Sequence, residues 1–226
     1  MSHYIIKSQF WHDRVNVLKK RGISPLTAID IGANVGEWYK DFKQIFPHAN
    51  VLSVEANPQF EAELKSVNPN SLITLMGREN NDMGVEFYIN PDTGNDAGAS
   101  IYREATTWGD KAMPTMMPMV TLDSLEQRFD WIKADVQGAE LDVLEGGGMT
   151  LQYAMIVELE LSTMRYNQGA PLAGEVIRWM WESGFELFDL TEHIYVEENG
   201  DGIHKLAQLN VLFLNRKYGH LLNITG

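Results

Sequence analysis

Apolar and polar positions along this chain alternate between two periods, one typical of buried strands and one typical of amphipathic helices. The first clear pair is an apolar segment at 28–31, followed by a stretch in which Trp38, Phe42 and Ile45 recur at helical spacing. Similar pairs follow through most of the chain. Because strands that alternate with helices join into a parallel sheet covered on both faces, the pattern predicts a doubly wound, mainly parallel α/β fold.

Eight segments have the length and composition of strands. They are residues 28–31, 51–55, 72–76, 85–89, 131–135, 154–161, 185–190 and 208–214. Helices are expected at residues 10–21, from Trp38 to before Pro47, after Asn57-Pro58, after Asp123, at 139–144 and around 176–181. No helical pattern separates the last two strands, which predicts that they pair antiparallel. A parallel sheet with such a C-terminal antiparallel strand is typical of the class I methyltransferase topology, a Rossmann-like fold, rather than of dinucleotide dehydrogenases.

Two parts of the chain depart from this alternation. Residues 91–118 are rich in Gly, Asp, Thr, Met and Pro, so we expect an inserted loop or lid there. The strand at 85–89 is expected to pair across a turn at 81–84. Residues 1–25 are expected to form an N-terminal helical extension. No internal repeat or linker is visible, and a length of 226 residues fits one domain spanning 1–226.

Composition narrows the range of partners. Asp and Glu outnumber Lys and Arg by 31 to 18, which gives a net charge of −13 and disfavours nucleic-acid binding, because phosphate backbones require clustered cations. Cysteine is absent, so disulfides, thiolate metal sites and cysteine nucleophiles are excluded. The sequence has no run of about 18 apolar residues and no secretory signal pattern. We therefore expect a cytoplasmic protein without membrane contact that acts on a small molecule.

Residues 29–36 read Ile-Asp-Ile-Gly-Ala-Asn-Val-Gly, which predicts a strand, a tight turn and the start of a helix. Such a turn places backbone N–H groups against a ligand, and Gly32 and Gly36 would let a cofactor approach the main chain. Asn34 occupies the position where dinucleotide-binding loops carry their second glycine. We therefore expect a cofactor without phosphates, such as S-adenosylmethionine. Asp30 would attract its ammonium group, tie down the turn amides, or do both.

The second predicted strand ends in Glu55. In doubly wound sheets, ligands bind at the carboxyl ends of the strands, and an acidic residue at this position accepts hydrogen bonds from ribose hydroxyls. Glu55 therefore has two interpretations. It is either a ribose contact or a cap for the helix that begins at Asn57 and Pro58.

Four motifs follow one another in a characteristic order. They are A-I-D-I-G-A-N-V-G at 28–36, V-E-A-N-P at 54–58, V-T-L-D-S-L at 120–125 and I-K-A-D-V-Q-G-A-E-L-D-V-L-E-G at 132–146. Together they resemble the FkbM-type S-adenosylmethionine-dependent methyltransferases. The first two motifs are shared by many methyltransferases, whereas the last two are much more specific. The resemblance extends from about Ala28 to the terminal strand at 209–214.

This resemblance implies a class I fold and O-methylation of a sugar or polyketide hydroxyl, with S-adenosylmethionine as cofactor. It also implies cofactor contacts by Ala56 in the second motif and by Arg78 and Glu79, which lie where this fold commonly meets the adenine. Ser100, in the insertion, would contact the cofactor or the acceptor. One departure is visible, because the family usually has glutamate where this chain has Gln137.

A hydroxyl acceptor must lose its proton during methyl transfer, to a carboxylate, a histidine or a metal-bound base. Asp135 ends the strand beside the cofactor's methyl group in this topology and is the leading catalytic residue, with Lys133 on the same strand face to tune it. Glu158 and Glu160 share a strand face, and Glu160 is expected in the substrate cleft. Asp135 and Glu160 offer a divalent cation two oxygen ligands, but two are few and no histidine is fixed nearby, so we predict a site without metal. Glu140 fits a site residue and a structural residue equally well, the latter either a surface carboxylate or a partner of the helix dipole.

Three functions fit these observations. The first is an S-adenosylmethionine-dependent O-methyltransferase that acts on a hydroxyl of a sugar or another small molecule. The second is a catalytically inactive methyltransferase fold that serves as a binding module, for which Gln137 is the visible hint. A nicotinamide-dependent oxidoreductase ranks third, because Asn34 replaces the glycine that pyrophosphate binding favours.

Overall fold

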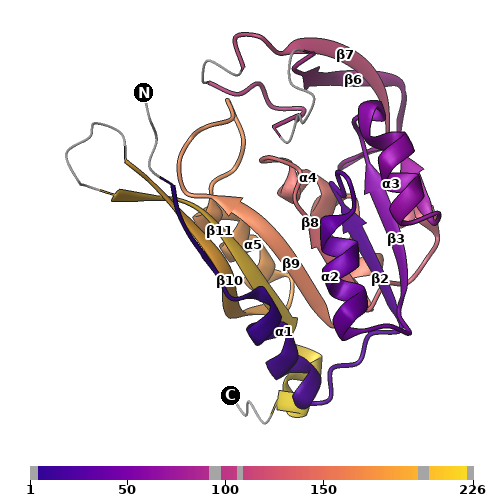
Figure 1. Ribbon diagram of the computed structural model, residues 1–226, viewed down its shortest axis with the longest axis vertical. Helices are drawn as coiled ribbons and strands as arrows, with labels where there is room; N and C mark the ends of the chain where they lie inside the picture. Colours follow the sequence, from indigo (N-terminus) through magenta and orange to yellow (C-terminus); the bar gives the residue numbers. More distant parts are fainter. Residues whose placement is uncertain (1–4, 92–97, 106–108, 198–203, 223–226) are drawn as a thin grey trace.

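The computed structural model describes residues 5–91, 98–105, 109–197 and 204–222, and its centre is an eight-stranded sheet (Figure 1). The strands lie in the order β1-β10-β11-β9-β8-β2-β3-β4. Their bounds are β1 (Ile5–Gln9), β2 (Thr27–Ile31), β3 (Asn50–Glu55), β4 (Ser71–Ile73), β8 (Trp131–Ala134), β9 (Ile156–Ser162), β10 (Phe185–Glu197) and β11 (His204–Asn215). The five strands from β9 to β4 are parallel, and β11, β10 and β1 extend the sheet antiparallel. The predicted fold class and the antiparallel pairing of the last two strands are confirmed.

The helices follow the strands closely. Their bounds are α1 (Trp11–Lys20), α2 (Glu37–Ile45), α3 (Glu61–Val67), α4 (Glu140–Glu145) and α5 (Ala173–Glu182), with 3₁₀ turns η1 (Pro58–Phe60), η2 (Asp123–Leu125), η3 (Thr150–Gln152) and η4 (Arg216–Leu222). The predicted helix start at Asn57 is confirmed, because the Asn57 side chain accepts a hydrogen bond from the Gln59 amide at 3.0 Å. Gly22, with φ of +96°, follows α1 where the sequence predicts its end.

The strand side chains divide between two helix layers, because successive residues of a strand point to opposite faces. Trp131 packs with residues of α1 and α2 in one core cluster, whereas Ile132 packs with residues of α4 and α5 in the other. Ile156 and Val157 divide in the same way. Figure 1 shows α2 in front of the sheet and α5 behind it. The sheet is thus covered on both faces, as a doubly wound fold requires.

A second, three-stranded sheet takes up part of the segment where a loop was expected. Its strands β5 (Leu75–Met76), β6 (Asn81–Ile89) and β7 (Met113–Val120) lie in the order β5-β7-β6. The expected strand at 72–76 is therefore divided between two sheets, and β6 pairs with β7 rather than across the turn at 81–84. The sequence pattern missed β7 because most of its side chains are exposed, which removes the alternation that marks a strand. Residues 92–97 and 106–108 of the expected lid lie outside the described residues.

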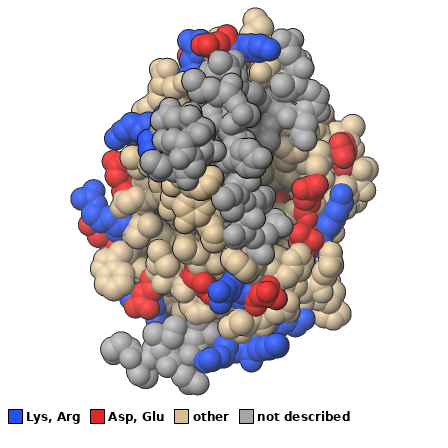
Figure 2. Space-filling model, turned by 60° about the vertical axis from the view of Figure 1, so that its left-hand side comes forward, with Lys and Arg blue, Asp and Glu red and all other residues tan. Residues whose placement is uncertain are grey.

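The N-terminal extension also differs from the prediction. It contains the expected helix α1, but β1 precedes it and pairs antiparallel with β10. The extension thereby adds an edge strand to the sheet as well as a helix to one of its faces. In the part of the chain that the structure describes, no helix has the length and apolar character that crossing a membrane requires. On the face shown in Figure 2, positive and negative side chains are interspersed.

Candidate active site

Two cavities adjoin each other where the central parallel strands end, and Gly32, Asn34 and Asp135 line both of them. The first has a volume of about 430 Å³. We name it the apolar cavity, after the lining residues Phe60, Leu75, Met76, Phe87 and Ile101. The second has a volume of about 540 Å³. We name it the acidic cavity, after the lining residues Asp13, Glu37, Asp41, Asp135, Glu158 and Glu192.

Glu55 lies at the end of β3 in the wall of the apolar cavity. One of its carboxylate oxygens accepts a hydrogen bond from the amide of Asn34 and the other from the amide of Asn57, both at 2.7 Å. The cap interpretation is therefore correct, and it does not exclude a ribose contact, because each carboxylate oxygen has a second lone pair. Burial raises the pKa of the Glu55 carboxyl above its ordinary value.

The glycine turn after β2 is satisfied by its own chain. The amides of Gly32 and Ala33 donate to the carbonyl of Val54 at 2.9 and 3.0 Å, and that of Asn34 donates to Glu55. The expectation that this turn presents free backbone N–H groups to a ligand is wrong for these three amides. A turn whose donors are already used makes a poor phosphate site, which agrees with the prediction of a cofactor without phosphates.

Gly32 is required by close packing inside the protein. It has φ of +78°, and a methyl group at this position would overlap the backbone carbonyl of Asp135, which follows β8. Gly36 also has positive φ, at +82°, and a methyl group there would press on Val67. Gly36 does not line either cavity among the described residues. The close approach at Gly32 holds the ends of β2 and β8 together and so positions Asp135.

Replacement of Gly32 by alanine is expected to lower the free energy of unfolding by about 3 kcal/mol or more, because left-handed strain of about 1–2 kcal/mol adds to the overlap with Asp135. Gly22→Ala is the matched control, since Gly22 has φ of +96° but no other atom lies within 4 Å of the added methyl. The free energy of unfolding of this control should fall only by the strain of about 1–2 kcal/mol. Denaturant unfolding measures both, and equal losses would show that the contact at Asp135 adds no constraint.

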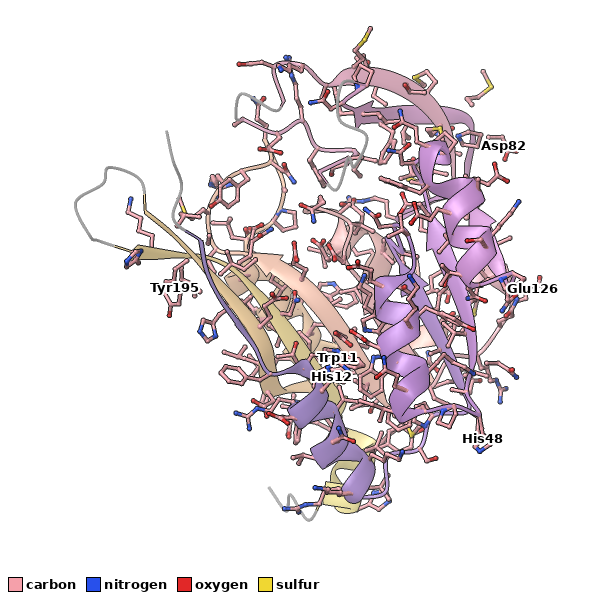
Figure 3. All side chains as sticks on the ribbon, viewed as in Figure 1. Trp11, His12, His48, Asp82, Glu126 and Tyr195 are labelled. Carbon is pink, nitrogen blue, oxygen red and sulfur yellow. The ribbon has the colours of Figure 1, made fainter. Side chains whose placement is uncertain are left out.

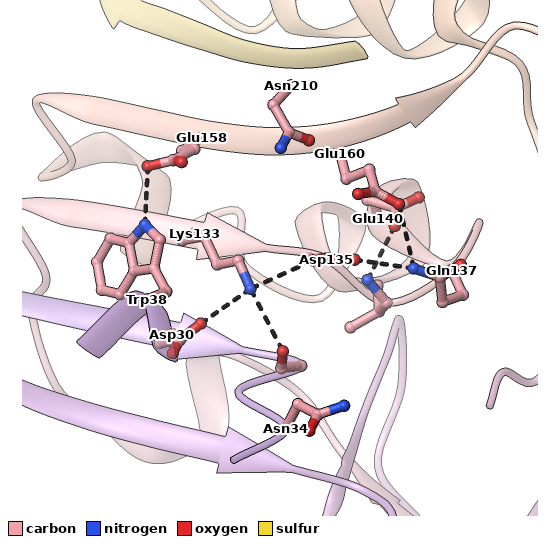
Figure 4. A network of polar contacts seen from close by, with 12 residues as sticks. Asp30, Asn34, Trp38, Lys133, Asp135, Gln137, Glu140, Glu158, Glu160 and Asn210 are labelled. Atoms are coloured by element: carbon pink, nitrogen blue, oxygen red, sulfur yellow. Dashed lines mark hydrogen bonds and ion pairs between the residues drawn. The ribbon is translucent and has the colours of Figure 1, made fainter. Parts of the chain in front are cut away.

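A row of charged side chains crosses three neighbouring strands on the sheet face that carries α1 and α2. Asp30 of β2 is the register partner of Lys133 of β8, and Lys133 is the partner of Glu158 of β9. Lys133 Nζ lies 3.1 Å from Asp30 Oδ1 and 3.5 Å from Asp135 Oδ2, and it donates to the Gly32 carbonyl at 3.3 Å (Figure 4). The predicted coupling of Lys133 to Asp135 is thus present. Asp30 is fully buried and faces Lys133 rather than either cavity among the described residues.

The charges in this row depend on one another. Burial alone would lower the pKa of the Lys133 ammonium, but the negative charges of Asp30 and Asp135 raise it above its ordinary value. Burial raises the pKa of Asp30, and Lys133 partly offsets this. Lys133 is therefore a cation whose charge is committed to holding Asp30 and orienting Asp135.

Glu158 is surrounded by three tryptophan side chains. The indole N–H groups of Trp11, Trp38 and Trp131 donate to its carboxylate at 2.7, 3.2 and 3.1 Å. Figure 4 shows Trp38 directly below this carboxylate. Burial raises the pKa of Glu158 to about 7. The sequence shows the three tryptophans, but an indole N–H can donate to any nearby acceptor. No local pattern therefore predicts that all three donate to Glu158.

Asp135 and Glu160 both line the apolar cavity, and of the two only Asp135 is among the described residues that also line the acidic cavity. The expected place of Glu160 in the substrate cleft stays a prediction. The side-chain amide of Gln137 joins the two residues, because its Nε2 donates to Asp135 at 3.0 Å and to Glu160 at 3.1 Å (Figure 4). Gln208 of β11 donates a further hydrogen bond to Glu160 at 2.8 Å. Burial and the charges of Asp135 and Glu140 raise the pKa of Glu160 to about 8.

Glu140 is buried, so the surface interpretation is wrong. Its carboxylate accepts hydrogen bonds from the amides of Val136 and Gly138 at 2.9 and 3.2 Å and shapes the turn between β8 and α4. Burial raises its pKa to about 7. Among the described residues, no group of three or more His, Asp or Glu side chains is arranged to hold a metal ion.

One family model decides the relationship of this chain to known proteins. The model described as the methyltransferase FkbM domain matches residues 30–187. The chain belongs to the FkbM methyltransferase family. The resemblance carried by the four sequence motifs is thereby confirmed, and S-adenosylmethionine is the cofactor that membership implies.

Three solved structures similar to this FkbM-family protein are methyltransferases by name, and their sequence identity to it is low. A methyltransferase FkbM from Methylobacillus flagellatus KT is 13% identical with a TM-score of 0.50, and the match covers 83% of this chain but only 43% of that one. A precorrin-6y C5,15-methyltransferase from Geobacter metallireducens GS-15 is 12% identical (TM-score 0.47; 89% and 86% covered). A SAM-dependent methyltransferase from Aquifex aeolicus is 14% identical (TM-score 0.43; 90% and 89% covered). No curated protein sequence matches the chain.

The lining of the apolar cavity in this FkbM-family protein fits S-adenosylmethionine in its chemistry. Phe60, Leu75 and Met76 offer an apolar surface for the adenine ring, and Glu55 offers acceptors for the ribose hydroxyls. Asp135 supplies negative charge for a cationic ligand, and the Glu160 carboxyl offers hydrogen-bonding oxygens beside it. No lysine, arginine or histidine is among the described residues that line this cavity, so nothing there complements a pyrophosphate.

Of three further residues expected to contact the cofactor, one lines the apolar cavity and two do not. Ala56 lines the apolar cavity, but Arg78 pairs with Asp142 at 2.6 Å, and Glu79 is exposed. Neither Arg78 nor Glu79 lines a described cavity, and Thr74, Leu75 and Met76 form that wall instead. β5 belongs to the second sheet and ends at Met76, so Arg78 and Glu79 lie beyond this wall.

Ser100 of the FkbM protein is buried, and its hydroxyl donates to the carbonyl of Gln137 at 2.8 Å. Its neighbours Ala99 and Ile101 line the apolar cavity, whereas Ser100 itself does not among the described residues. Gln137 has φ of +54°, so this bond supports a strained turn. Ser100 thus supports the turn that carries Gln137, and its contact with cofactor or acceptor stays a prediction.

Proposed function

We propose that this protein is an S-adenosylmethionine-dependent O-methyltransferase whose acceptor is a hydroxyl group of a sugar or another small molecule. The observation that carries the proposal is the position of Asp135, which borders the apolar cavity on one side and the acidic cavity on the other. A carboxylate at such a boundary is available to an acceptor hydroxyl that approaches a methyl donor from the second cavity.

The residues divide the chemistry as follows. When bound, the cofactor supplies a methyl group on a sulfonium, which is transferred by in-line displacement. Asp135 accepts the proton of the acceptor hydroxyl while the oxygen of that hydroxyl forms the new bond to the methyl carbon. Lys133 and Gln137 each bind one Asp135 oxygen, at 3.5 and 3.0 Å, and hold the carboxylate in place. The products are a methyl ether, S-adenosylhomocysteine and a proton that passes from Asp135 to solvent.

The two other functions receive less support. The pyrophosphate of a nicotinamide dinucleotide would lie against the turn after β2. The amides of Gly32, Ala33 and Asn34 there already donate hydrogen bonds within the protein and are not available to the phosphates. A pure binding module would not need the polar contacts that orient Asp135. Gln137, which was the hint for such a module, is explained by its role as donor to Asp135 and Glu160, a role that an ionised glutamate cannot perform.

Calorimetric titration with S-adenosylhomocysteine tests the cofactor, with NAD as the parallel ligand. We expect binding of the first and none of the second. Glu55→Gln should lower the affinity for S-adenosylhomocysteine by about 10- to 100-fold, because hydrogen bonds to a charged group contribute about 1.5–3 kcal/mol each. Glu63→Gln, which changes an exposed glutamate outside both cavities, is the matched control.

Three results would contradict the proposal. If the folded protein releases no heat of binding with S-adenosylhomocysteine, the assignment of S-adenosylmethionine as cofactor is wrong. Binding of NAD alone would favour the oxidoreductase. Binding of S-adenosylhomocysteine without transfer of a labelled methyl group to any of a broad set of hydroxylated acceptors would favour the binding module.

A further inference from the structure

Acidic side chains greatly outnumber basic ones in the lining of the acidic cavity. Six carboxylates and one lysine are among the described residues that line it, together with His12. The lysine is Lys133, whose charge is already engaged by Asp30 and Asp135. Asp13, Glu37 and Asp41 lie outside this ion pair and present negative charge to whatever enters. A phosphorylated or carboxylated molecule would therefore meet repulsion there.

The outer wall of this cavity is built by two helices that face each other. Glu37 and Asp41 lie one turn apart on α2 and so share a face of that helix. His12 of α1 approaches Asp41, with Nε2 3.6 Å from Oδ1, and Asp13 follows it. Figure 3 shows Trp11 and His12 on the side of α1 that faces α2. Three carboxylates, Asp13, Glu37 and Asp41, are thereby brought to one wall of the acidic cavity.

Aromatic side chains and amides complete the wall. Trp11 and Trp38 meet edge to face with ring centroids 6.2 Å apart, and both are anchored by their N–H groups on Glu158. Fixed aromatic rings bind cations and the apolar faces of sugars. Asn210 lines the cavity beside them and donates to Glu192 at 2.9 Å. The cavity is therefore polar and aromatic together.

One buried acceptor atom at the boundary of the two cavities has no donor. Oδ1 of Asn34 is inaccessible to solvent and receives no hydrogen bond from the part of the chain that the structure describes. Buried carbonyl oxygens are almost always hydrogen-bonded in native proteins. Because Asn34 lines both cavities, an N–H or O–H group of a ligand is the natural partner after a small side-chain adjustment.

We propose that the acidic cavity binds the methyl acceptor and that the acceptor is a positively charged amino sugar. Its ammonium group lies among Asp13, Glu37 and Asp41, its ring packs against Trp11 and Trp38, and a hydroxyl faces Asp135. The inference rests on the proposed methyltransferase function. The N-terminal part of this wall, Trp11 to Asp13, precedes the segment 30–187 that matches the family model, whereas Glu37, Trp38 and Asp41 lie within it.

The test compares three probes on protein saturated with S-adenosylhomocysteine, with tryptophan fluorescence as the signal. Glucosamine carries the ammonium, N-acetylglucosamine has the same ring without the charge, and glucose 6-phosphate carries negative charge. We expect glucosamine to bind at least about tenfold more tightly than N-acetylglucosamine, equivalent to one charge-assisted contact of about 1.4 kcal/mol. Glucose 6-phosphate should not saturate the signal.

Two triple variants make the result specific. Asp13→Asn with Glu37→Gln and Asp41→Asn should abolish the preference for glucosamine while leaving S-adenosylhomocysteine affinity unchanged. The matched control neutralises three exposed carboxylates outside both cavities, with the changes Glu63→Gln, Asp82→Asn and Glu126→Gln. Figure 3 shows Asp82 and Glu126 on the far side of α2 from Trp11. The control should keep the preference.

The possible outcomes separate this inference from the function on which it rests. Failure to bind S-adenosylhomocysteine overturns the proposed function. Normal S-adenosylhomocysteine binding with equal or tighter binding of N-acetylglucosamine or glucose 6-phosphate overturns the amino-sugar inference alone, and so does the absence of binding by all three probes. A preference for glucosamine that survives the triple variant shows that the ammonium is bound elsewhere.

Discussion

Replacement of Asp135 by asparagine is expected to lower the rate of methyl transfer by about 10²- to 10⁴-fold, the range usual for loss of a general base. Asparagine keeps the size of the side chain and can still accept a hydrogen bond from Gln137, but it cannot take up the acceptor proton. The loss should therefore fall on kcat, while KM and S-adenosylhomocysteine affinity change by no more than about threefold.

Asp82→Asn is the matched control for this variant, because it removes an exposed aspartate that lines neither described cavity. Initial rates of labelled methyl transfer, measured for both variants on the same acceptor, provide the comparison. A normal rate with Asp135→Asn would show that the proton leaves by another route.

Replacement of Lys133 by methionine is expected to lower the free energy of unfolding by about 3–5 kcal/mol, the usual cost of leaving a buried charge without its partner. Lys133 is the ion-pair partner of Asp30, which is completely buried, and it also offsets the burial of Glu158. Lys65→Met is the matched control, because Lys65 pairs with Glu61 on the surface of α3. That exposed pair should contribute less than about 1 kcal/mol.

The pH dependence of this loss follows from the direction of the Asp30 shift. Burial raises the pKa of Asp30 in the folded protein above its ordinary value of 3.8, and loss of Lys133 raises it further. A carboxyl whose folded pKa is raised contributes stability that is present below its ordinary pKa and lost as the pH rises through the folded pKa. The deficit of Lys133→Met should therefore shrink as the pH falls from about 8 to about 5, and denaturant unfolding across this range measures it. A deficit that is constant with pH would show that Asp30 is not the group left unpaired.

The main departures from the predicted fold lie where local pattern is weak. The Met- and Pro-rich strand β7 exposes most of its side chains and gains its place by pairing with β6 and β5. β1 likewise takes its place by pairing with β10, a strand far along the chain. In both cases the strand is defined by backbone hydrogen bonds to a distant partner, which a local apolar pattern does not encode.

By itself, the amino-acid sequence determined the doubly wound sheet, the family, the cofactor class and the group of acidic residues at the strand ends. Those features follow from short-range rules, namely the apolar period, the glycine turn and the order of four motifs. Only the tertiary structure decided which side chains meet. Strand register placed Asp30, Lys133 and Glu158 in one row, and helix packing brought Trp11 to Glu158 across 147 residues of sequence. Such contacts depend on the packing of whole elements, since each partner has many local alternatives until the core is formed.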